Sequence, residues 1–285
     1  MKSGHFLRRS FLESLLKLTR FGNLIIIALA QYFTAGFLIG MHTLNDVKLF
    51  LLSVSTTAIA AGGYIINDYY DVKIDYINKP DRVVIGKNIT RRYAILFHIV
   101  LSFIGVALGF YLSWRIAAVN MLSVFLLWLY SNNLKRLPFI GNFTVAFLTG
   151  LSVIVVDIFY RTENSLVVIY ALFAFFMTLI REIIKDMEDL QGDNTFGCKT
   201  LPIVWGVRKT KILIYIILMV FAATVVLLNQ LYRALPFKYH LVFLFLPLLW
   251  LLYRLIRADM KKDFTRLSTF CKVILLLGIL SMAFM

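Results

Sequence analysis

The stretch KLFLLSVSTTAIAAGGYII, from Lys48 to Ile66, is followed without a break by NDYYDVKID, from Asn67 to Asp75. The apolar stretch has one charged residue in 19 and is long enough to cross the hydrocarbon core of a bilayer as an α-helix. Three aspartates come directly after it. This junction predicts a membrane-spanning helix with an acidic cluster at one face of the membrane.

Similar apolar runs recur along the chain, which has 285 residues, 60% of them hydrophobic and 16% charged. A water-soluble fold of this composition would lack enough polar surface to cover itself. We therefore predict an all-α membrane protein, a bundle of about nine transmembrane helices forming a single polytopic domain over residues 1–285. The nine segments are Leu24–Gly40, Lys48–Ile66, Tyr93–Leu112, Ile116–Tyr130, Phe139–Val156, Leu166–Ile184, Ile212–Asn229, Leu241–Arg254 and Leu267–Met285.

Two local features qualify this assignment. The stretch from Tyr111 to Trp114 is expected to form only a tight turn between two long helices. Pro247 interrupts the eighth segment and is expected to kink it, because proline removes a helical hydrogen bond.

Basic residues give the chain a net charge of +15, and their placement predicts its orientation. When the connections are numbered alternately, 24 of the 30 Lys and Arg fall on one side of the membrane. Cytoplasmic loops carry such an excess, so the N-terminus is predicted to be cytoplasmic and the protein to be a multi-pass protein of the cell membrane. Anionic membrane lipids then account for the basic charge, and no nucleic-acid partner is expected.

Acidic residues gather in two windows on that predicted cytoplasmic side. Nine of the 15 Asp and Glu lie between Asp68 and Asp81 or between Glu182 and Asp193. Each window holds a triad with the same spacing of three and then four residues, and the second triad follows the first by 118 positions. The two triads, an internal repeat, are Asp68, Asp71 and Asp75, and Asp186, Asp189 and Asp193.

On a helix, positions i, i+3 and i+7 share one face, so each triad should project its carboxylates together from the end of a transmembrane helix. Carboxylates this close repel each other unless a cation neutralises them, and Mg²⁺ bound to phosphates is well suited to several oxygen ligands. Asn67 could add a neutral oxygen ligand beside the first triad. The plainer interpretation is that these acids are solvated helix ends, and the repeated spacing favours a site over it.

Longer strings around the triads resemble one protein family. NDYYDVKIDYINKPDR, from Asn67 to Arg82, resembles the first Asp-rich signature of the UbiA prenyltransferases, and REIIKDMEDLQGDNTFGCKTLP, from Arg181 to Pro202, resembles the second. The likeness covers essentially the whole chain. It implies nine helices, with the two motifs at 67–82 and 181–202 following helices two and six.

The resemblance also implies roles for individual residues. Asn67, Asp68, Asp71 and Asp75 would bind one magnesium cluster and Asp186, Asp189 and Asp193 the other, with Asp71 and Asp189 catalytic. Residues that would help to hold a diphosphate are Arg82, Lys135 in YSNNLKR (Tyr130–Arg136), Lys199, and Arg20 and Asn23 in TRFGN (Thr19–Asn23). In this last string Phe21 replaces the proline that is usual in the family.

The implied activity is a Mg²⁺-dependent transfer of a prenyl group from an isoprenyl diphosphate to an acceptor at the membrane interface. The string IDYINKPDR, from Ile74 to Arg82, most resembles the branch that acts on geranylgeranylglycerol phosphate in ether-lipid synthesis. Aromatic acceptors of the quinone type, or a chlorophyll-type acceptor, stay open.

Two other classes of protein are alternatives. Intramembrane acids and an internal repeat also mark ion-coupled transporters, but here the acids gather at one membrane face instead of the midplane. CDP-alcohol phosphotransferases also use membrane-embedded aspartates and metal, and their DGxxAR lead-in is absent from this chain.

Overall fold

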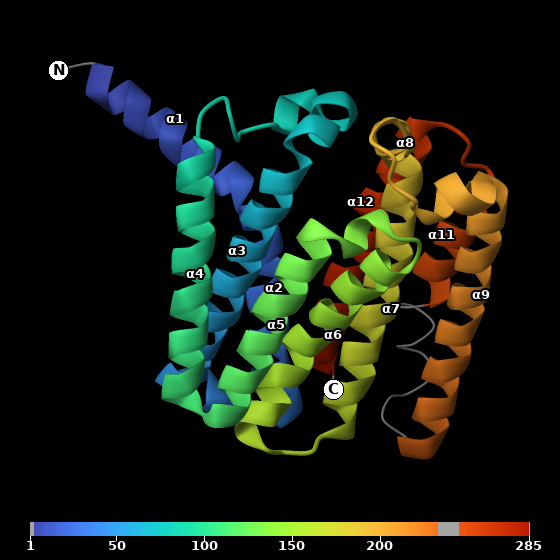
Figure 1. Ribbon diagram of the computed structural model, residues 1–285. Helices are drawn as coiled ribbons and strands as arrows, with labels where there is room; N and C mark the ends of the chain where they lie inside the picture. Colours follow the sequence, from blue (N-terminus) through green and yellow to red (C-terminus); the bar gives the residue numbers. More distant parts are fainter. Residues whose placement is uncertain (1–2, 233–244, 285) are drawn as a thin grey trace. The chain divides into compact units, whose positions relative to one another are not determined.

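The computed structural model of the chain describes residues 3–232 and 245–284 (Figure 1). Within these ranges the regular structure is helical, apart from an isolated β-bridge between Ile85 and Ile89. Eight helices are long and apolar enough to cross a membrane, and one further apolar helix has 11 residues. The prediction of an all-α membrane protein with about nine helices is confirmed.

The nine apolar helices correspond to the predicted segments. They are α2 (Phe21–Phe33) continued by η1 (Thr34–Ile39), α3 (Val47–Asn78), α4 (Arg91–Leu112), α5 (Trp114–Asn132), α6 (Ile140–Tyr160), α7 (Ser165–Glu188), α9 (Leu201–Tyr232), α11 (Leu246–Ile256) and α12 (Lys261–Ser281). Shorter elements are α1 (Ser3–Leu18), η2 (Met41–Asn45), η3 (Pro80–Arg82), η4 (Leu134–Arg136), α8 (Leu190–Thr195) and η6 (Met282–Phe284).

Helix α3 is longer than the apolar run that predicted it. The run ends at Ile66, but the helix continues for three more turns to Asn78. Hydropathy marks where lipid contact ends, whereas a helix continues as long as its backbone hydrogen bonds and side chains favour it. The first acidic motif therefore lies on the helix itself and not in a loop.

Pro247 lies at the start of α11 as the structure describes this helix. Residues 241–244 of the predicted eighth segment lie outside the described residues, and α11 begins at Leu246 with Pro247 in its first turn. A proline is favoured there because the first backbone N–H groups of a helix have no intrahelical acceptor. The predicted kink concerns the part of the segment before Phe245, and residues 233–244 lie outside the described ranges.

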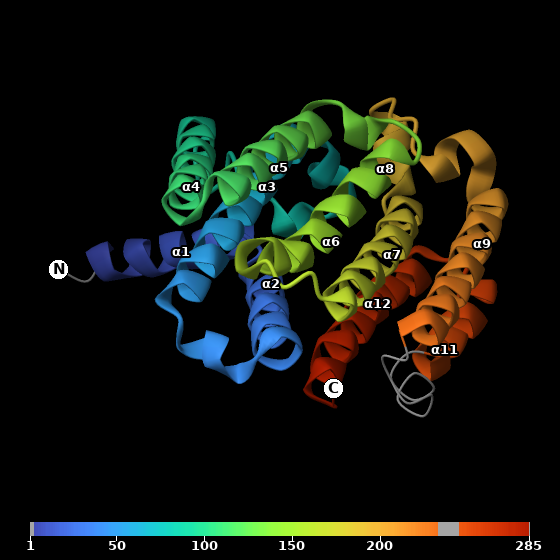
Figure 2. The same cartoon turned by 90° about the horizontal axis from the view of Figure 1, so that it is seen from below.

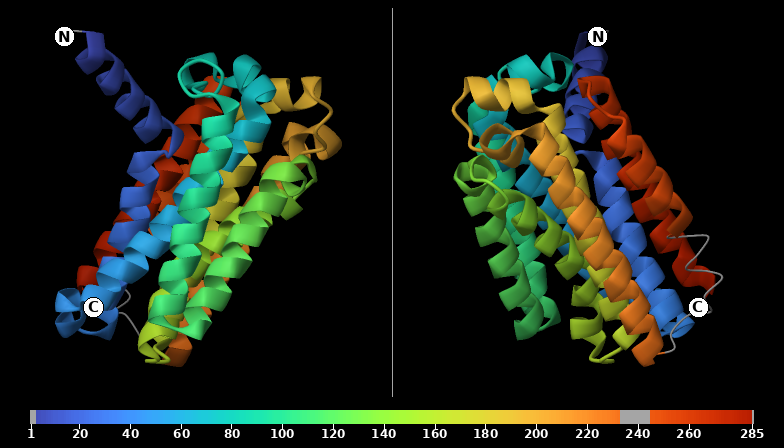
Figure 3. Two further views of the ribbon diagram at one scale, coloured as in Figure 1. Left: turned by 60° about the vertical axis from the view of Figure 1, so that its left-hand side comes forward. Right: turned by 90° about the vertical axis from the view of Figure 1, so that its right-hand side faces the viewer.

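One compact unit comprises residues 1–28 and 47–134. In it α3 packs against α4 and α5, and α4 and α5 are joined at Ser113 by the predicted tight turn (Figure 3). Asn120 of α5 donates hydrogen bonds of 2.8 Å to the carbonyl of Gly105 on α4 and 2.7 Å to Ser55 Oγ on α3. Gly105 admits this close packing, because a Cβ there would lie 2.9 Å from the Ser55 carbonyl oxygen.

The other unit comprises residues 29–46 and 135–285. Its central helix is α7, which packs against α6, α9 and α12 (Figure 2). The core between these helices includes Met177, Ile180 and Phe221, all fully buried. Because α7 is enclosed in this way, the acidic motif at its end sits on a fixed support.

Candidate active site

The first acidic motif occupies the last turns of α3. Asn67, Asp68, Asp71 and Asp75 all lie within the helix and are half-buried. The expectation that these side chains share one helix is therefore correct, and their spacing puts them on one face.

Arg20 is bound to this motif through Asp68. It lies between α1 and α2, with φ of 50°, and its Nη2 donates to Asp68 Oδ1 at 2.7 Å. Its guanidinium also lies 4.9 Å from the centre of the Tyr64 ring. Burial alone would lower the pKa of Arg20, but the Asp68 carboxylate raises it above its ordinary value, so the guanidinium stays charged.

Asn23, the other predicted residue of this segment, donates a 3.3 Å hydrogen bond from Nδ2 to the hydroxyl of Tyr64. The resemblance implies that Arg20 and Asn23 help to hold a diphosphate. Here the structure brings both to the end of α3, where Arg20 neutralises one predicted metal ligand and Tyr64 links the two.

The connection after α3 brings Arg82 to the same carboxylates. A small hollow of about 10 Å³ is lined by Asp68, Asp75 and Arg82 together with apolar residues, which are Val72, Val83, Val84 and Ile85. That volume is about the size of one water molecule. Val84 and Ile85 are buried against Leu18 and Ile65, so the connection is packed onto the unit and holds Arg82 in place.

The second motif is built differently. Helix α7 ends at Glu188, Asp189 is its C-terminal capping residue with φ of −95° and ψ of 6°, and Asp193 lies in the separate short helix α8. The expectation that the whole second triad projects from one helix is therefore wrong, although the spacing is identical. The backbone N–H of Asp193 still reaches the carbonyl of Asp189 at 3.1 Å, which keeps the two residues one turn apart.

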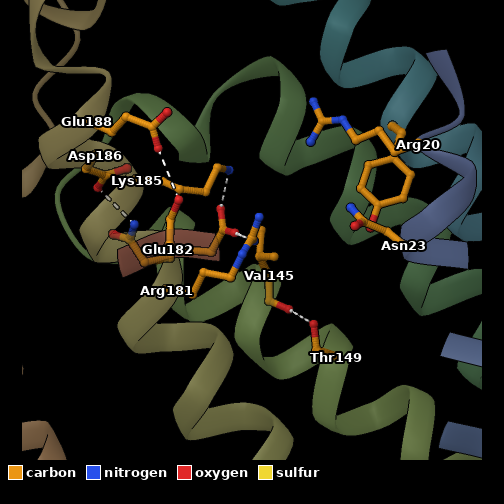
Figure 4. A network of polar contacts seen from close by, with 12 residues as sticks. Arg20, Asn23, Val145, Thr149, Arg181, Glu182, Lys185, Asp186 and Glu188 are labelled. Carbon is orange, nitrogen blue, oxygen red and sulfur yellow. Dashed lines mark hydrogen bonds and ion pairs between the residues drawn. The ribbon is translucent and has the colours of Figure 1, made fainter. Parts of the chain in front are cut away.

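Asp186 is held by a residue that the sequence did not single out. Asn142, buried in the first turn of α6, donates from Nδ2 to Asp186 Oδ2 at 2.9 Å (Figure 4). The sequence shows this residue only as a single asparagine near the start of an apolar run. Such residues often serve only to hydrogen-bond neighbouring transmembrane helices, so the sequence alone did not indicate a role in the site. Hydrogen bonds of this kind orient metal-binding carboxylates.

The two glutamates of the second window have structural partners. Glu182 is buried and pairs with Arg181 and, at 3.0 Å, with Lys185 Nζ (Figure 4). Glu188 accepts a 3.2 Å hydrogen bond from Ser268 Oγ on α12. These contacts give both glutamates partners within the unit.

The predicted lysines Lys135 and Lys199 lie on neighbouring segments. Lys135 is in η4, and the backbone N–H of Lys199 donates to the carbonyl of Arg136 at 2.8 Å. Lys199 is exposed and Lys135 is half-buried. The structure therefore brings these two together in one unit, and it brings Arg20, Asn23 and Arg82 together in the other.

The donor set fits a Mg²⁺ ion that keeps other ligands of its own. In the part of the chain that the structure describes, no three His, Cys, Asp or Glu side chains form a metal cage by themselves. Mg²⁺ is usually held by one or two carboxylates, waters and substrate phosphates, so an all-protein cage is not required. Half-buried carboxylates beside Arg82 and a water-sized hollow match that mode of binding.

Comparison with known proteins identifies the family. A sequence profile described as the UbiA prenyltransferase family matches residues 28–276. This chain belongs to the UbiA prenyltransferase family. The match includes both acidic motifs and all nine apolar helices except the first residues of α2 and the end of α12.

Individual relatives agree with this UbiA assignment. A digeranylgeranylglyceryl phosphate synthase of Saccharolobus solfataricus is 38% identical over 216 residues, covering 73% of this chain and 76% of that protein. Another, of Methanosphaera stadtmanae, is 32% identical over 244 residues, covering 85% and 89%.

Solved structures share the fold. A structure described as giving insights into digeranylgeranylglyceryl phosphate synthase in membranes has a TM-score of 0.70 and 25% identity, and the match covers 96% of this chain and 99% of that one. A UbiA homologue from Archaeoglobus fulgidus bound to GPP and Mg²⁺ has a TM-score of 0.67 and 14% identity, with 95% and 99% covered. This chain is therefore a multi-pass integral membrane protein of the UbiA fold.

We expect Asn142→Leu to raise the Mg²⁺ concentration needed for half-maximal activity by about tenfold or more, because outer hydrogen-bond partners of metal ligands typically have effects of that size. Loss of the 2.9 Å contact would leave Asp186 without its donor on α6. The measurement is the rate of prenyl transfer as a function of Mg²⁺ concentration. Thr144→Val is the matched control, because the Thr144 hydroxyl donates to the carbonyl of Ile140 on its own helix and, among the described residues, has no bond to the acidic motif. An unchanged Mg²⁺ requirement for Asn142→Leu would remove Asn142 from the site.

Proposed function

We propose that the protein transfers a geranylgeranyl group from geranylgeranyl diphosphate to geranylgeranylglycerol phosphate, in a Mg²⁺-dependent step of ether-lipid synthesis. The observation that carries this proposal is the match to digeranylgeranylglyceryl phosphate synthases over 85% of this chain at 32% identity. The product in that name carries two geranylgeranyl groups on a glycerol phosphate. A prenyltransferase that makes it must add one of these groups.

The reaction is a substitution at C1 of the allylic diphosphate. The bond between C1 and the diphosphate oxygen breaks, and its electron pair leaves with the diphosphate. The acceptor hydroxyl oxygen forms the new ether bond to C1 and loses its proton to solvent. Bound Mg²⁺ would stabilise the charge that develops on the departing diphosphate.

The residues of the chain have distinct tasks in this scheme. The first Mg²⁺ ion would take oxygen ligands from α3, which are Asn67, Asp68, Asp71 and Asp75. The second would take them from the end of α7, from α8 and from the residue between them, which are Asp186, Asp193 and Asp189. Arg82, Lys135 and Lys199 offer positive charge to the diphosphate. Arg20, which pairs with Asp68, and Asn23, which bonds Tyr64, would also help to hold the diphosphate. We propose that residues 1–285 act together as one prenyltransferase domain.

An aromatic acceptor of the quinone or chlorophyll type is the alternative within the family. It would require a group that activates a phenol or a related acceptor, and no described residue is assigned that role. The names of the relatives favour a glycerol phosphate.

Radiolabel transfer by the purified full chain tests the class of activity. With Mg²⁺, labelled geranylgeranyl diphosphate and geranylgeranylglycerol phosphate, label should move into a new lipid, and chelation of Mg²⁺ should stop it. Mg²⁺-dependent uptake of solute into proteoliposomes without any prenyl transfer would instead indicate a transporter.

The active site is further proposed to face the cytoplasm at the cell membrane, because 24 of the 30 basic residues follow that alternation. Lys87→Cys and Asn194→Cys should both be shielded from an impermeant thiol reagent in intact cells, and Lys48→Cys should react. All three positions are exposed, and the native Cys198 and Cys271 are buried. Labelling of Lys87→Cys and Asn194→Cys from opposite sides would contradict the proposed topology.

A further inference from the structure

A groove runs between α11 and α12, away from both acidic motifs in sequence. Its volume is about 290 Å³, near the lower end of the range for ligand pockets. The lining residues are Trp250, Arg254, Arg266, Leu267, Thr269, Phe270 and Val273. Five of these seven are apolar or carry only a hydroxyl, and two are arginines, so the groove is amphipathic.

The two arginines sit at one end of this groove. Arg254 is two residues before the end of α11, and Arg266 is five residues after the start of α12. These two helices pack against each other and are joined by residues 257–260, so both arginines lie near that connection. Val273 is seven residues beyond Arg266, about 10 Å further along the helix axis. Charge is therefore concentrated at the end of a spanning helix, and apolar surface extends toward its middle.

Two aromatic side chains, Trp250 and Phe270, line the groove beside the arginines. The rings of Trp250 and Phe270 have centroids 4.2 Å apart, and the Arg254 guanidinium lies 5.5 Å from the Trp250 ring. The Trp250 ring on α11 therefore packs directly against the Phe270 ring on α12. A tryptophan beside a basic residue at a helix end is typical of the membrane–water interface.

The charge of the arginines is available to a ligand. Among the described residues, no ion pair involves Arg254 or Arg266. Two carboxylates lie close in sequence, but both have other partners. Asp259 pairs with Lys211 Nζ at 3.0 Å, and Asp263 accepts from the backbone N–H of Met260 at 3.2 Å at the start of α12.

We propose that this groove binds an anionic phospholipid of the bilayer, with the phosphate between Arg254 and Arg266 and the upper part of one chain against Trp250 and Phe270. An anionic headgroup matches the two cations, and basic pockets between transmembrane helices bind such headgroups. The apolar lining residues would not bind a free phosphate. They would contact an acyl or isoprenoid chain that continues into the membrane. This site is distinct from the one proposed for prenyl transfer.

Fluorescence quenching of Trp250 tests the proposal. Trp114, Trp128 and Trp205 are replaced by phenylalanine, and the full chain is reconstituted into vesicles containing brominated phosphatidylglycerol or brominated phosphatidylcholine with identical chains. Quenching of Trp250 should reach half its maximum at a several-fold lower mole fraction of phosphatidylglycerol, because each basic residue near the surface contributes on the order of fivefold to anionic-lipid binding. An excess of inorganic phosphate should leave this preference unchanged.

Two double variants complete the test. Arg254→Gln with Arg266→Gln should make the two quenching curves coincide, while quenching by phosphatidylcholine stays the same and shows that the fold is intact. Arg208→Gln with Lys209→Gln removes two exposed basic residues of α9 outside the groove and should retain the preference. The proposal would be overturned by any of three results. These are equal quenching by both lipids in the chain whose single tryptophan is Trp250, a preference for phosphatidylglycerol that persists in Arg254→Gln with Arg266→Gln, and loss of that preference when phosphate is added. None of these readings depends on prenyl transfer.

Discussion

Replacing Asp71 with alanine is expected to lower the rate of prenyl transfer by on the order of 10³-fold, which corresponds to about 4 kcal/mol of transition-state stabilisation. Asp71 lies in the middle of the first motif on α3, between Asp68 and Asp75. Loss of its carboxylate removes an oxygen ligand and a negative charge from the proposed Mg²⁺ cluster. The departing diphosphate would then lose the charge stabilisation on which the step depends.

The fold should tolerate this change, because alanine favours a helix and one member of a cluster of like charges is removed. Asp81→Ala is the matched control, since Asp81 is an exposed carboxylate of the same segment outside the triad. Rates are measured on purified protein whose elution as a single species has been checked. Near-normal activity of Asp71→Ala would mean that the first triad is only a solvated helix end.

Asp189→Ala is expected to have an effect of similar size through the second cluster. Asp189 ends α7, and its backbone N–H already bonds the carbonyl of Lys185 at 2.8 Å, so the substitution leaves this helix end in place. Residues that act as a unit are not additive. The double variant Asp71→Ala with Asp189→Ala should therefore be little slower than either single variant.

Glu188→Gln serves as the control for this second position. The glutamine can still accept the hydrogen bond from Ser268, so packing against α12 is kept and activity should change little. Strictly multiplicative losses in the double variant, or a Glu188→Gln enzyme as slow as Asp189→Ala, would argue against the roles proposed for Asp71 and Asp189.

The number and type of the helices could be predicted from the sequence because apolar runs of spanning length are a strong signal. The residues at which the helices begin and end could not be predicted in the same way. Helix α3 outlasts its apolar run by three turns, since lipid contact and helix propensity end at different residues. Pro247 lies in the first turn of α11 as described, and the position of a proline within a helix is not decided by periodicity alone.

The candidate site was predicted as a set of residue types and not as a geometry. Identical spacing suggested identical triads, yet the chain leaves the helix at Asp189, close to the helix-weakening Gly192, and only the first triad lies wholly on one helix. The pairing of Arg20 with Asp68 joins residues 48 positions apart, and that of Asn142 with Asp186 joins residues 44 apart. Contacts at such separations depend on helix packing, which a single sequence does not encode in any local pattern.

Mass spectrometry of the lipids made by the purified full chain tests the central claim most directly. The protein receives geranylgeranyl diphosphate, Mg²⁺ and an equimolar panel of geranylgeranylglycerol phosphate, unprenylated glycerol phosphate and aromatic acceptors. We expect one dominant product whose mass equals geranylgeranylglycerol phosphate plus one geranylgeranyl group. It should be absent when Mg²⁺ is chelated, and Asp71→Ala should form it at a rate lower by on the order of 10³-fold. A prenylated aromatic product, with geranylgeranylglycerol phosphate left unchanged, would contradict the proposed acceptor.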